Sequence, residues 1–205
     1  MVMLDYRTMA NLQHKHAGIV LAAGASSRMG RPKALLPAPS GKPLAADQAD
    51  RLRTAGAADV VVVLGHHAEE LATALADHHL RCAFNAGWER GRLGSLQTGL
   101  AALASEVAGT VVVPVDAAFI RTDTIAALLA CADTTRHAAV RAWHDGQPGH
   151  LAWIARDLFP ALLGLDPDPS FRLDQWLAPH THRLDVDDPA VRNNLNTPAD
   201  WSSPG

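Results

Sequence analysis

The sequence is poor in cysteine and contains no long apolar run. Cys82 and Cys131 are the two cysteines among 205 residues. Their spacing matches no metal-binding motif and each lies among apolar residues, so we expect small buried side chains rather than a disulfide or a nucleophile. No apolar stretch approaches the roughly 20 residues of a membrane span, and the N-terminus lacks the apolar core of a signal peptide. These absences predict a cytoplasmic protein without a membrane segment.

An excess of charge of either sign is also lacking. The formal net charge is −3 and the isoelectric point about 6.4. Such a balance disfavours a nucleic-acid partner and a membrane surface. The chain has three lysines, Lys15, Lys33 and Lys42, whereas arginine is common. Two of the three lysines lie in or just after a glycine-containing loop, which hints at a use for a compact ammonium there.

Apolar strands alternate with helical patterns along the chain, which predicts a largely parallel sheet flanked by helices. Residues 1–16 resemble a polar extension, and residues 17–205 are expected to form a single domain without repeats or a linker. The predicted strands are 19–22, 60–64, 80–84, 110–115, 138–143 and 151–154, with an edge strand at 182–186. The predicted helices are 43–55, 68–75, 95–103 and 170–177, with Ser95 and Ser170 as N-caps, and Ile125, Leu128 and Leu129 mark one further helix.

The most informative segment is residues 18–33, GIVLAAGASSRMGRPK. An apolar strand leads directly into a loop of small residues that carries Arg28, Arg31 and Lys33. Gly24 and Gly30 are expected to permit a positive φ and to leave space against the main chain. Backbone N–H groups, hydroxyls and cations at the carboxyl end of a strand are typical of phosphate binding in α/β proteins.

Spacing excludes two common phosphate loops. Five residues separate Gly24 from Gly30 and Arg31-Pro32 follows, whereas a Walker loop has four residues between its glycines and then Lys-Ser/Thr. The dinucleotide fingerprint requires Gly-x-Gly, and Ala25-Ser26 follows Gly24 here. A dinucleotide-dependent reductase is therefore a distant alternative.

The pattern Leu-Ala-Ala-Gly-x-Ser-x-Arg-Met-Gly-x-x-Lys over residues 21–33 resembles the signature of the molybdenum cofactor cytidylyl- and guanylyltransferases. This resemblance implies a three-layer Rossmann-like nucleotidyltransferase fold with a mostly parallel mixed sheet. It implies a transfer of a nucleoside monophosphate from a triphosphate to a phosphorylated acceptor of the molybdopterin type, with release of pyrophosphate. The implied partners are the triphosphate, the acceptor, and a molybdoenzyme or its maturation factor.

Asp116 follows the apolar run Val111-Val112-Val113-Pro114-Val115. A carboxylate at the carboxyl end of a central strand points into the crevice where α/β sheets bind ligands, and it is a suitable ligand for Mg²⁺. The alternative is a turn or cap residue. The resemblance implies that Asp116 holds the catalytic metal, although the family usually has x-Pro after this aspartate and this chain has Ala117-Ala118. The missing proline removes a rigid turn.

Three later segments resemble further elements of the family. Residues 193–198, NNLNTP, resemble its closing motif and make Asn194 and Asn196 candidate metal ligands, although Asn and Pro are also ordinary turn residues. Residues 85–96 resemble its Asn-x-x-Trp-x-x-Gly-x-x-x-Ser-Leu element, in which free N–H groups at residues 94–96 would favour an anion beside Ser95. Residues 146–150, GQPGH, resemble its Gly-x-x-Gly-His element and place His150 near the acceptor.

The resemblance implies a role for each candidate residue. Arg28, Lys33 and Asp116 are the expected catalytic residues, with Mg²⁺ as cofactor. The expected nucleotide-binding residues are Leu21, Ala22, Ala23, Gly24, Ser26, Gly30, Lys33 and Ser95. The expected metal ligands are Asp116, Asn194 and Asn196, and the expected acceptor-binding residues are Ser95 and His150.

The base preference is predicted from Ala23. Guanylyl members usually have Leu-Ala-Gly-Gly at this position, and an alanine methyl would crowd a base that lies on the loop. The sequence therefore favours CTP over GTP. Two alternatives stay open: the same chemistry on a sugar phosphate, and a non-catalytic nucleotide- or cofactor-binding protein that assists molybdopterin insertion, which the missing proline favours.

Overall fold

The computed structural model of the chain describes residues 15–197 and 200–201, without the side chain of Arg28. Seven strands form one sheet in the order β3-β2-β1-β4-β6-β5-β7. They are β1 (His16–Ala22), β2 (Ala57–Leu64), β3 (Arg81–Phe84), β4 (Gly109–Pro114), β5 (Ala139–His144), β6 (Gln147–Ala155) and β7 (Thr181–Asp185). Strand β6 is antiparallel to its neighbours β4 and β5, and all other pairings are parallel. The predicted mostly parallel mixed sheet is confirmed.

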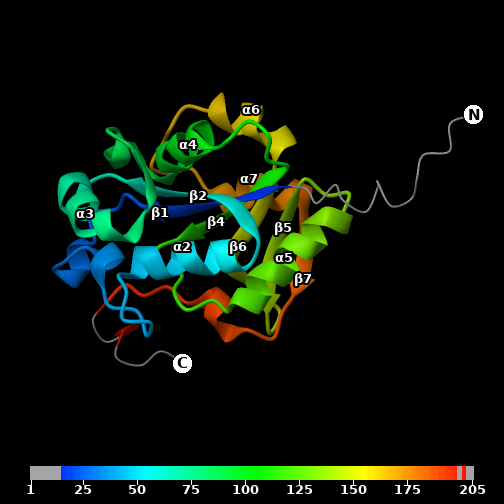
Figure 1. Cartoon of the computed structure of the whole chain (residues 1–205). Helices are drawn as coiled ribbons and strands as arrows, with labels where there is room; N and C mark the ends of the chain where they lie inside the picture. Colours follow the sequence, from blue (N-terminus) through cyan, green and yellow to red (C-terminus); the bar gives the residue numbers. More distant parts are fainter. Residues whose placement is uncertain (1–14, 198–199, 202–205) are drawn as a thin grey trace, which may run out of the picture.

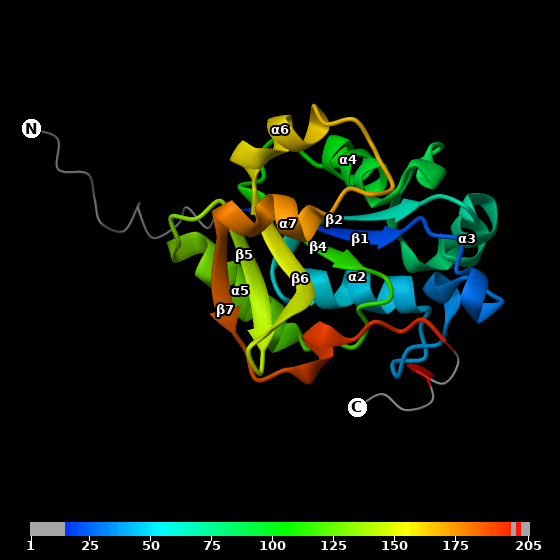
Figure 2. The same cartoon turned by 180° about the vertical axis from the view of Figure 1, so that it is seen from behind.

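Helices cover both faces of this sheet (Figure 1). Helices α2 (Leu44–Thr54) and α5 (Thr122–Thr134) pack on one face, and α4 (Arg92–Ala102), α6 (Phe159–Leu163) and α7 (Leu173–Leu177) on the other (Figure 2). Helix α3 (Ala68–Ala74) follows β2. The core accordingly divides into two apolar clusters, one on each face of the sheet. This is the three-layer arrangement that the sequence predicts.

Close packing between layers explains the glycine that begins the informative segment. A Cβ on Gly18 in β1 would lie 2.9 Å from Leu52 Cδ1 in α2. Such a distance is shorter than any normal carbon–carbon contact, so α2 approaches β1 this closely because residue 18 has no side chain. Strand β1 begins at His16, which is 5% exposed, so this residue belongs to the sheet and not to the expected extension. Residues 1–14 of that extension lie outside the described residues.

Two predicted helix starts are wrong by three residues. Helix α4 begins at Arg92 after Gly91, which has a φ of 100°, and buried Ser95 lies inside the helix instead of capping it. Helix α7 begins at Leu173, and Ser170 N–H donates to Asp168 Oδ1 in the preceding turn. In both cases serine is a favourable N-cap residue, but the helix begins three residues away from it, because tertiary packing overrides this local preference.

The turn between β5 and β6 is shorter than predicted, because β5 ends at His144 and β6 begins at Gln147. Asp145 and Gly146 have φ values of 49° and 70°, as in a two-residue type I′ turn. Residues 147–149 therefore belong to β6, and His150 lies within that strand rather than at its start. The Asp-Gly pair was the available signal for this turn.

The prediction for Cys82 is wrong. Cys82 is exposed and Cys131 partly buried, and both thiols are free. Cys82 lies on β3, an edge strand of four residues that is mostly exposed to solvent. Its apolar neighbours in sequence do not reflect burial because an edge strand lacks a partner on one side. Within the described residues, none of the helices is long and apolar enough to cross a membrane.

Candidate active site

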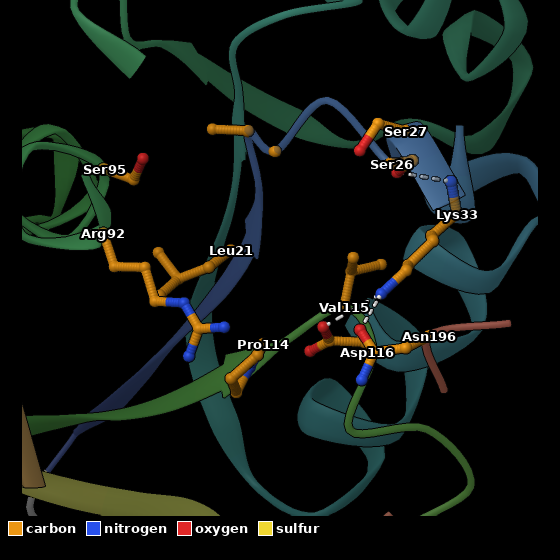
Figure 3. Close-up of a pocket in the computed structure, with 12 residues that line it drawn as sticks. Leu21, Ser26, Ser27, Lys33, Arg92, Ser95, Pro114, Val115, Asp116 and Asn196 are labelled. Carbon is orange, nitrogen blue, oxygen red and sulfur yellow. Dashed lines mark hydrogen bonds and ion pairs between the residues drawn. The ribbon is translucent and has the colours of Figure 1, made fainter. Parts of the chain in front are cut away.

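A pocket of about 210 Å³ lies at the carboxyl ends of β1 and β4 (Figure 3). Three parts of the chain meet there: the loop after β1, the loop after β4, and the first turn of α4, with Asn196 closing one side. The residues that line it are Leu21, Ala23, Gly24, Ser26, Ser27, Lys33, Arg92, Ser95, Pro114, Val115, Asp116 and Asn196. Its position agrees with the rule that open α/β sheets bind ligands beyond the carboxyl ends of their strands.

The loop after β1 is folded around two left-handed residues. Ser26 has a φ of 53° and Gly30 a φ of 69°. The positive φ predicted for Gly30 is found, whereas the second one falls at Ser26 and not at Gly24. Lys33 N–H donates to Ser26 Oγ at 3.1 Å, which closes the loop. A Cβ on Gly24 would meet no atom within 4 Å, so the main chain here is open to a ligand.

Lys33 links two distant parts of the chain. Its ammonium donates to Asp116 Oδ2 at 3.1 Å and to Asn196 Oδ1 at 2.8 Å. The side chain of Lys33 is 10% exposed and that of Asp116 18%. A buried ammonium requires oxygen partners, and here one carboxylate and one amide supply them. The structure thus brings together three residues that sequence reasoning selected separately.

Hydrogen bonds fix the orientation of Asn196. Its Nδ2 group donates to Asn194 Oδ1 at 2.8 Å, so its oxygen is turned toward Lys33. Asp200 Oδ2 accepts from the N–H groups of Asn196 and Thr197 at 2.9 and 2.8 Å. These bonds hold the pKa of Asp200 below its ordinary value. Asn194 does not line the pocket, but it accepts a hydrogen bond from Asn196, which does.

The loop that carries Asp116 is held from both sides. Gln48 in α2 is buried, and its Nε2 group donates to the carbonyls of Val115 at 3.2 Å and Ala117 at 3.1 Å, with Pro114 O at 3.4 Å. On the other side, Leu195 N–H donates to Asp116 O at 2.9 Å. The rigid turn that the family's proline would provide after Asp116 is missing here, and the hydrogen bonds of Gln48 hold this loop in its place.

Ser95 and Arg92 form the wall opposite Lys33 (Figure 3). Buried Asn85 donates through Nδ2 to Ser95 Oγ at 3.0 Å, and its Oδ1 accepts from Gly87 N–H. Because α4 begins at Arg92, its unpaired N–H groups belong to residues 92–94 and not to residues 94–96 as predicted.

His150 lies near the pocket but does not line it. Burial lowers the pKa of His150, the cations Arg141 and Arg92 lower it further, and Asp116 opposes them. Arg141, on the neighbouring strand, donates through Nε to Gly149 O at 2.8 Å.

Most of the predicted nucleotide-binding residues line the pocket. Leu21, Ala23, Gly24, Ser26, Lys33 and Ser95 do so, whereas Ala22 is part of the core and Gly30 lies outside the lining. Arg28 lies in a short 3-10 turn, and its side chain is outside the described atoms, so its role stays a prediction.

Sequence reasoning missed Arg92, Gln48 and Asp200. Arg92 carried a visible signal, a cation in the loop that leads to Ser95. Asp200 also carried one, because Thr197 and Asp200 have the spacing of a capping box. Gln48 carried none, since nothing in a helix sequence shows which carbonyls a glutamine will meet.

The chain is similar to several known proteins. It is 34% identical over 195 residues to a molybdenum cofactor guanylyltransferase of Xanthomonas euvesicatoria, covering 93% of this chain and 95% of that protein. It is also 40% identical over 86 residues to the nicotine blue oxidoreductase of Paenarthrobacter nicotinovorans, covering 42% of each.

Solved structures and a family comparison agree with these similarities. The crystal structure of Rv0371c from Mycobacterium tuberculosis H37Rv has a TM-score of 0.77 and 27% identity, covering 92% of this chain and 96% of that one. The MobA-like NTP transferase domain family matches residues 18–184, which include the loop after β1, Asp116 and Ser95. The chain therefore belongs to the MobA-like NTP transferase family and is a nucleotidyltransferase.

Proposed function

We propose that this protein transfers a nucleoside monophosphate from a nucleoside triphosphate to the terminal phosphate of a molybdopterin-type acceptor. An acceptor phosphate oxygen forms the new bond to the α-phosphorus, the bond from that phosphorus to the bridging oxygen breaks, and pyrophosphate leaves. The observation that carries this proposal is the meeting of Lys33, Asp116 and Asn196 beside an open phosphate loop. The name of the Xanthomonas relative supports the acceptor.

The residues of the chain act by position and charge. Ser26, Ser27 and the main chain at Gly24 line the end of the pocket beside Lys33, where they offer donors to the β- and γ-phosphates. Lys33 adds a cation that exchanges its contact with Asp116 for phosphate oxygens. Preorganised donors and cations of this kind account for most catalysis of phosphoryl and nucleotidyl transfer, which requires no covalent enzyme intermediate.

The donor set suits Mg²⁺. Asp116 Oδ2 and Asn196 Oδ1 converge on one point, because both lie within hydrogen-bond distance of Lys33 Nζ. Carboxylate and amide oxygens together with substrate phosphates are the ligands that Mg²⁺ prefers. Asp116 and Asn196 would hold the ion together with the phosphates of the substrate. When bound, the ion supplies positive charge against the phosphates.

We propose GTP as the donor, in place of the CTP predicted from Ala23. Ala23 is only 5% exposed, and its methyl group packs toward Gly65, where a Cβ would come within 2.8 Å of it. This methyl therefore presents little surface to a base. The Xanthomonas relative is named a guanylyltransferase, which supports the same choice.

The test is pyrophosphate release from each of the four triphosphates, with and without molybdopterin or a sugar phosphate. We expect release that depends on GTP, on Mg²⁺ and on molybdopterin. Asp116→Asn should lower kcat at least about 100-fold without loss of folding, because the site loses its carboxylate. Asp166→Asn is the matched control, since Asp166 is exposed and does not line the pocket.

Each other outcome has a defined meaning. If pyrophosphate is released with a sugar phosphate and not with molybdopterin, the acceptor is a sugar phosphate. Nucleotide binding without release of pyrophosphate would favour the non-catalytic alternative, and unchanged turnover in Asp116→Asn would remove the role of that residue.

A further inference from the structure

The end of the pocket remote from Lys33 has a different chemistry from the phosphate end. Leu21 contributes an apolar surface there, while Ser95 and Arg92 contribute hydrogen-bond donors (Figure 3). The Arg92 side chain extends across this end of the pocket toward Pro114 (Figure 3). An apolar wall with a few convergent donors is typical of a site for a flat heterocycle.

Ser95 at this end is held by a hydrogen bond, whereas Arg92 has no acidic partner among the described residues. Ser95 Oγ accepts from Asn85 Nδ2, so its hydrogen is left to donate. Arg92 begins α4, and no described carboxylate forms an ion pair with it. Arg90, two residues earlier, differs in this respect, because it donates to Asp166 Oδ1 at 2.7 Å. Arg92 thus presents guanidinium donors to the pocket without a competing acidic partner.

We propose that Arg92 reads the base of the nucleotide and selects guanine. This inference rests on the proposed function, which places the triphosphate at the Lys33 end and therefore the base at the Arg92 end. Guanine presents two adjacent acceptors, O6 and N7, which match the paired donors of a guanidinium. Cytosine and adenine each place an amino donor beside an acceptor and repel a second N–H group. Selection by Arg92 accounts for a guanine preference despite the alanine at position 23.

The experiment measures equilibrium binding of GTP and CTP by calorimetry, with Mg²⁺ and without any acceptor, so that no transfer occurs. We expect the wild-type protein to bind GTP at least about tenfold more tightly than CTP. Arg92→Met should reduce this ratio to near one while CTP affinity changes little. Arg92→Lys should retain part of the ratio, because a single ammonium keeps donors but not the paired geometry.

Arg90→Met is the matched control, since it removes a neighbouring arginine that is paired with Asp166 and does not line the pocket. It should keep the wild-type ratio. An unchanged ratio in Arg92→Met, with both nucleotides still bound, would overturn the inference and leave the proposed function intact. A wild-type preference for CTP would also overturn it. If the wild-type protein binds neither nucleotide and releases no pyrophosphate, the proposed function itself fails, and the inference fails with it.

Discussion

At the scale of single residues, the surroundings of His150 predict a pKa below the ordinary value for histidine. Burial and two nearby arginines lower its pKa, and Asp116 does not cancel their effect. We expect the resolved imidazole resonance of His150 to titrate below pH 6.5 by NMR, with His150→Gln used to assign it. A midpoint at or above 6.5 would contradict the surroundings described for this side chain.

The same lowered pKa has a consequence for stability. Between the folded and the ordinary pKa the unfolded chain binds more protons than the folded one, so the free energy of unfolding falls as the pH drops through this window. We expect urea unfolding at pH 7.5 and 5.5 to show a smaller loss of stability in His150→Gln than in the wild-type protein. An equal loss in both proteins would mean that other groups account for the pH dependence.

Residue type and the neighbouring sequence were enough to select single candidate residues of the site. Lys33, Asp116 and Asn196 were each predictable because a cation, a carboxylate and an amide followed strand or turn signals. Their mutual contact was not predictable from composition, since Lys33 and Asn196 are 163 residues apart in sequence. Ser95 was correctly placed at the pocket, but its helix position was wrong, because serine favours both caps and buried hydrogen bonds.

At the scale of elements, α2 positions the loop after β4 through Gln48. Gln48→Met keeps the side-chain volume but leaves the carbonyls of Val115 and Ala117 without their donor. We expect about 1–3 kcal/mol lower stability together with a lower kcat for pyrophosphate release and weaker Mn²⁺ binding in the presence of nucleotide. Gln48 would then be a positioning residue for Asp116.

The control for this prediction is Gln97→Met. Gln97 Nε2 likewise donates to two carbonyls, those of Leu162 and Leu165, but on the other face of the sheet. It should lose comparable stability and retain its Mn²⁺ affinity. If both variants lose Mn²⁺ binding equally, the effect of Gln48 is on general stability alone.

Most elements were predictable because their apolar periodicity is strong. The buried strands β2 and β4 read as continuous valine-rich runs, which only a sheet covered on both faces accommodates. Apolar periodicity did not predict the start of α4 or the β5–β6 turn, because Gly91 and Asp145-Gly146 set them through positive φ values. For the turn, the Asp-Gly pair was the available signal.

At the scale of the whole molecule, the site joins the first and last described segments of the chain. Leu195 N–H donates to Asp116 O, and Asn196 contacts Lys33. We expect GTP with Mg²⁺ to slow amide hydrogen exchange in residues 193–197 as well as in residues 23–33, because a ligand that binds only the folded site suppresses local opening in both. Protection confined to residues 23–33 would exclude the closing segment from the site.

Lys33 has a further consequence in its contact with Asp116. Its ammonium has a carboxylate partner at 3.1 Å. In the proposed function, pyrophosphate therefore competes with Asp116 for the same cation after each transfer. We expect this internal competitor to weaken product inhibition, so that the contact between Lys33 and Asp116 also promotes release of the product between turnovers.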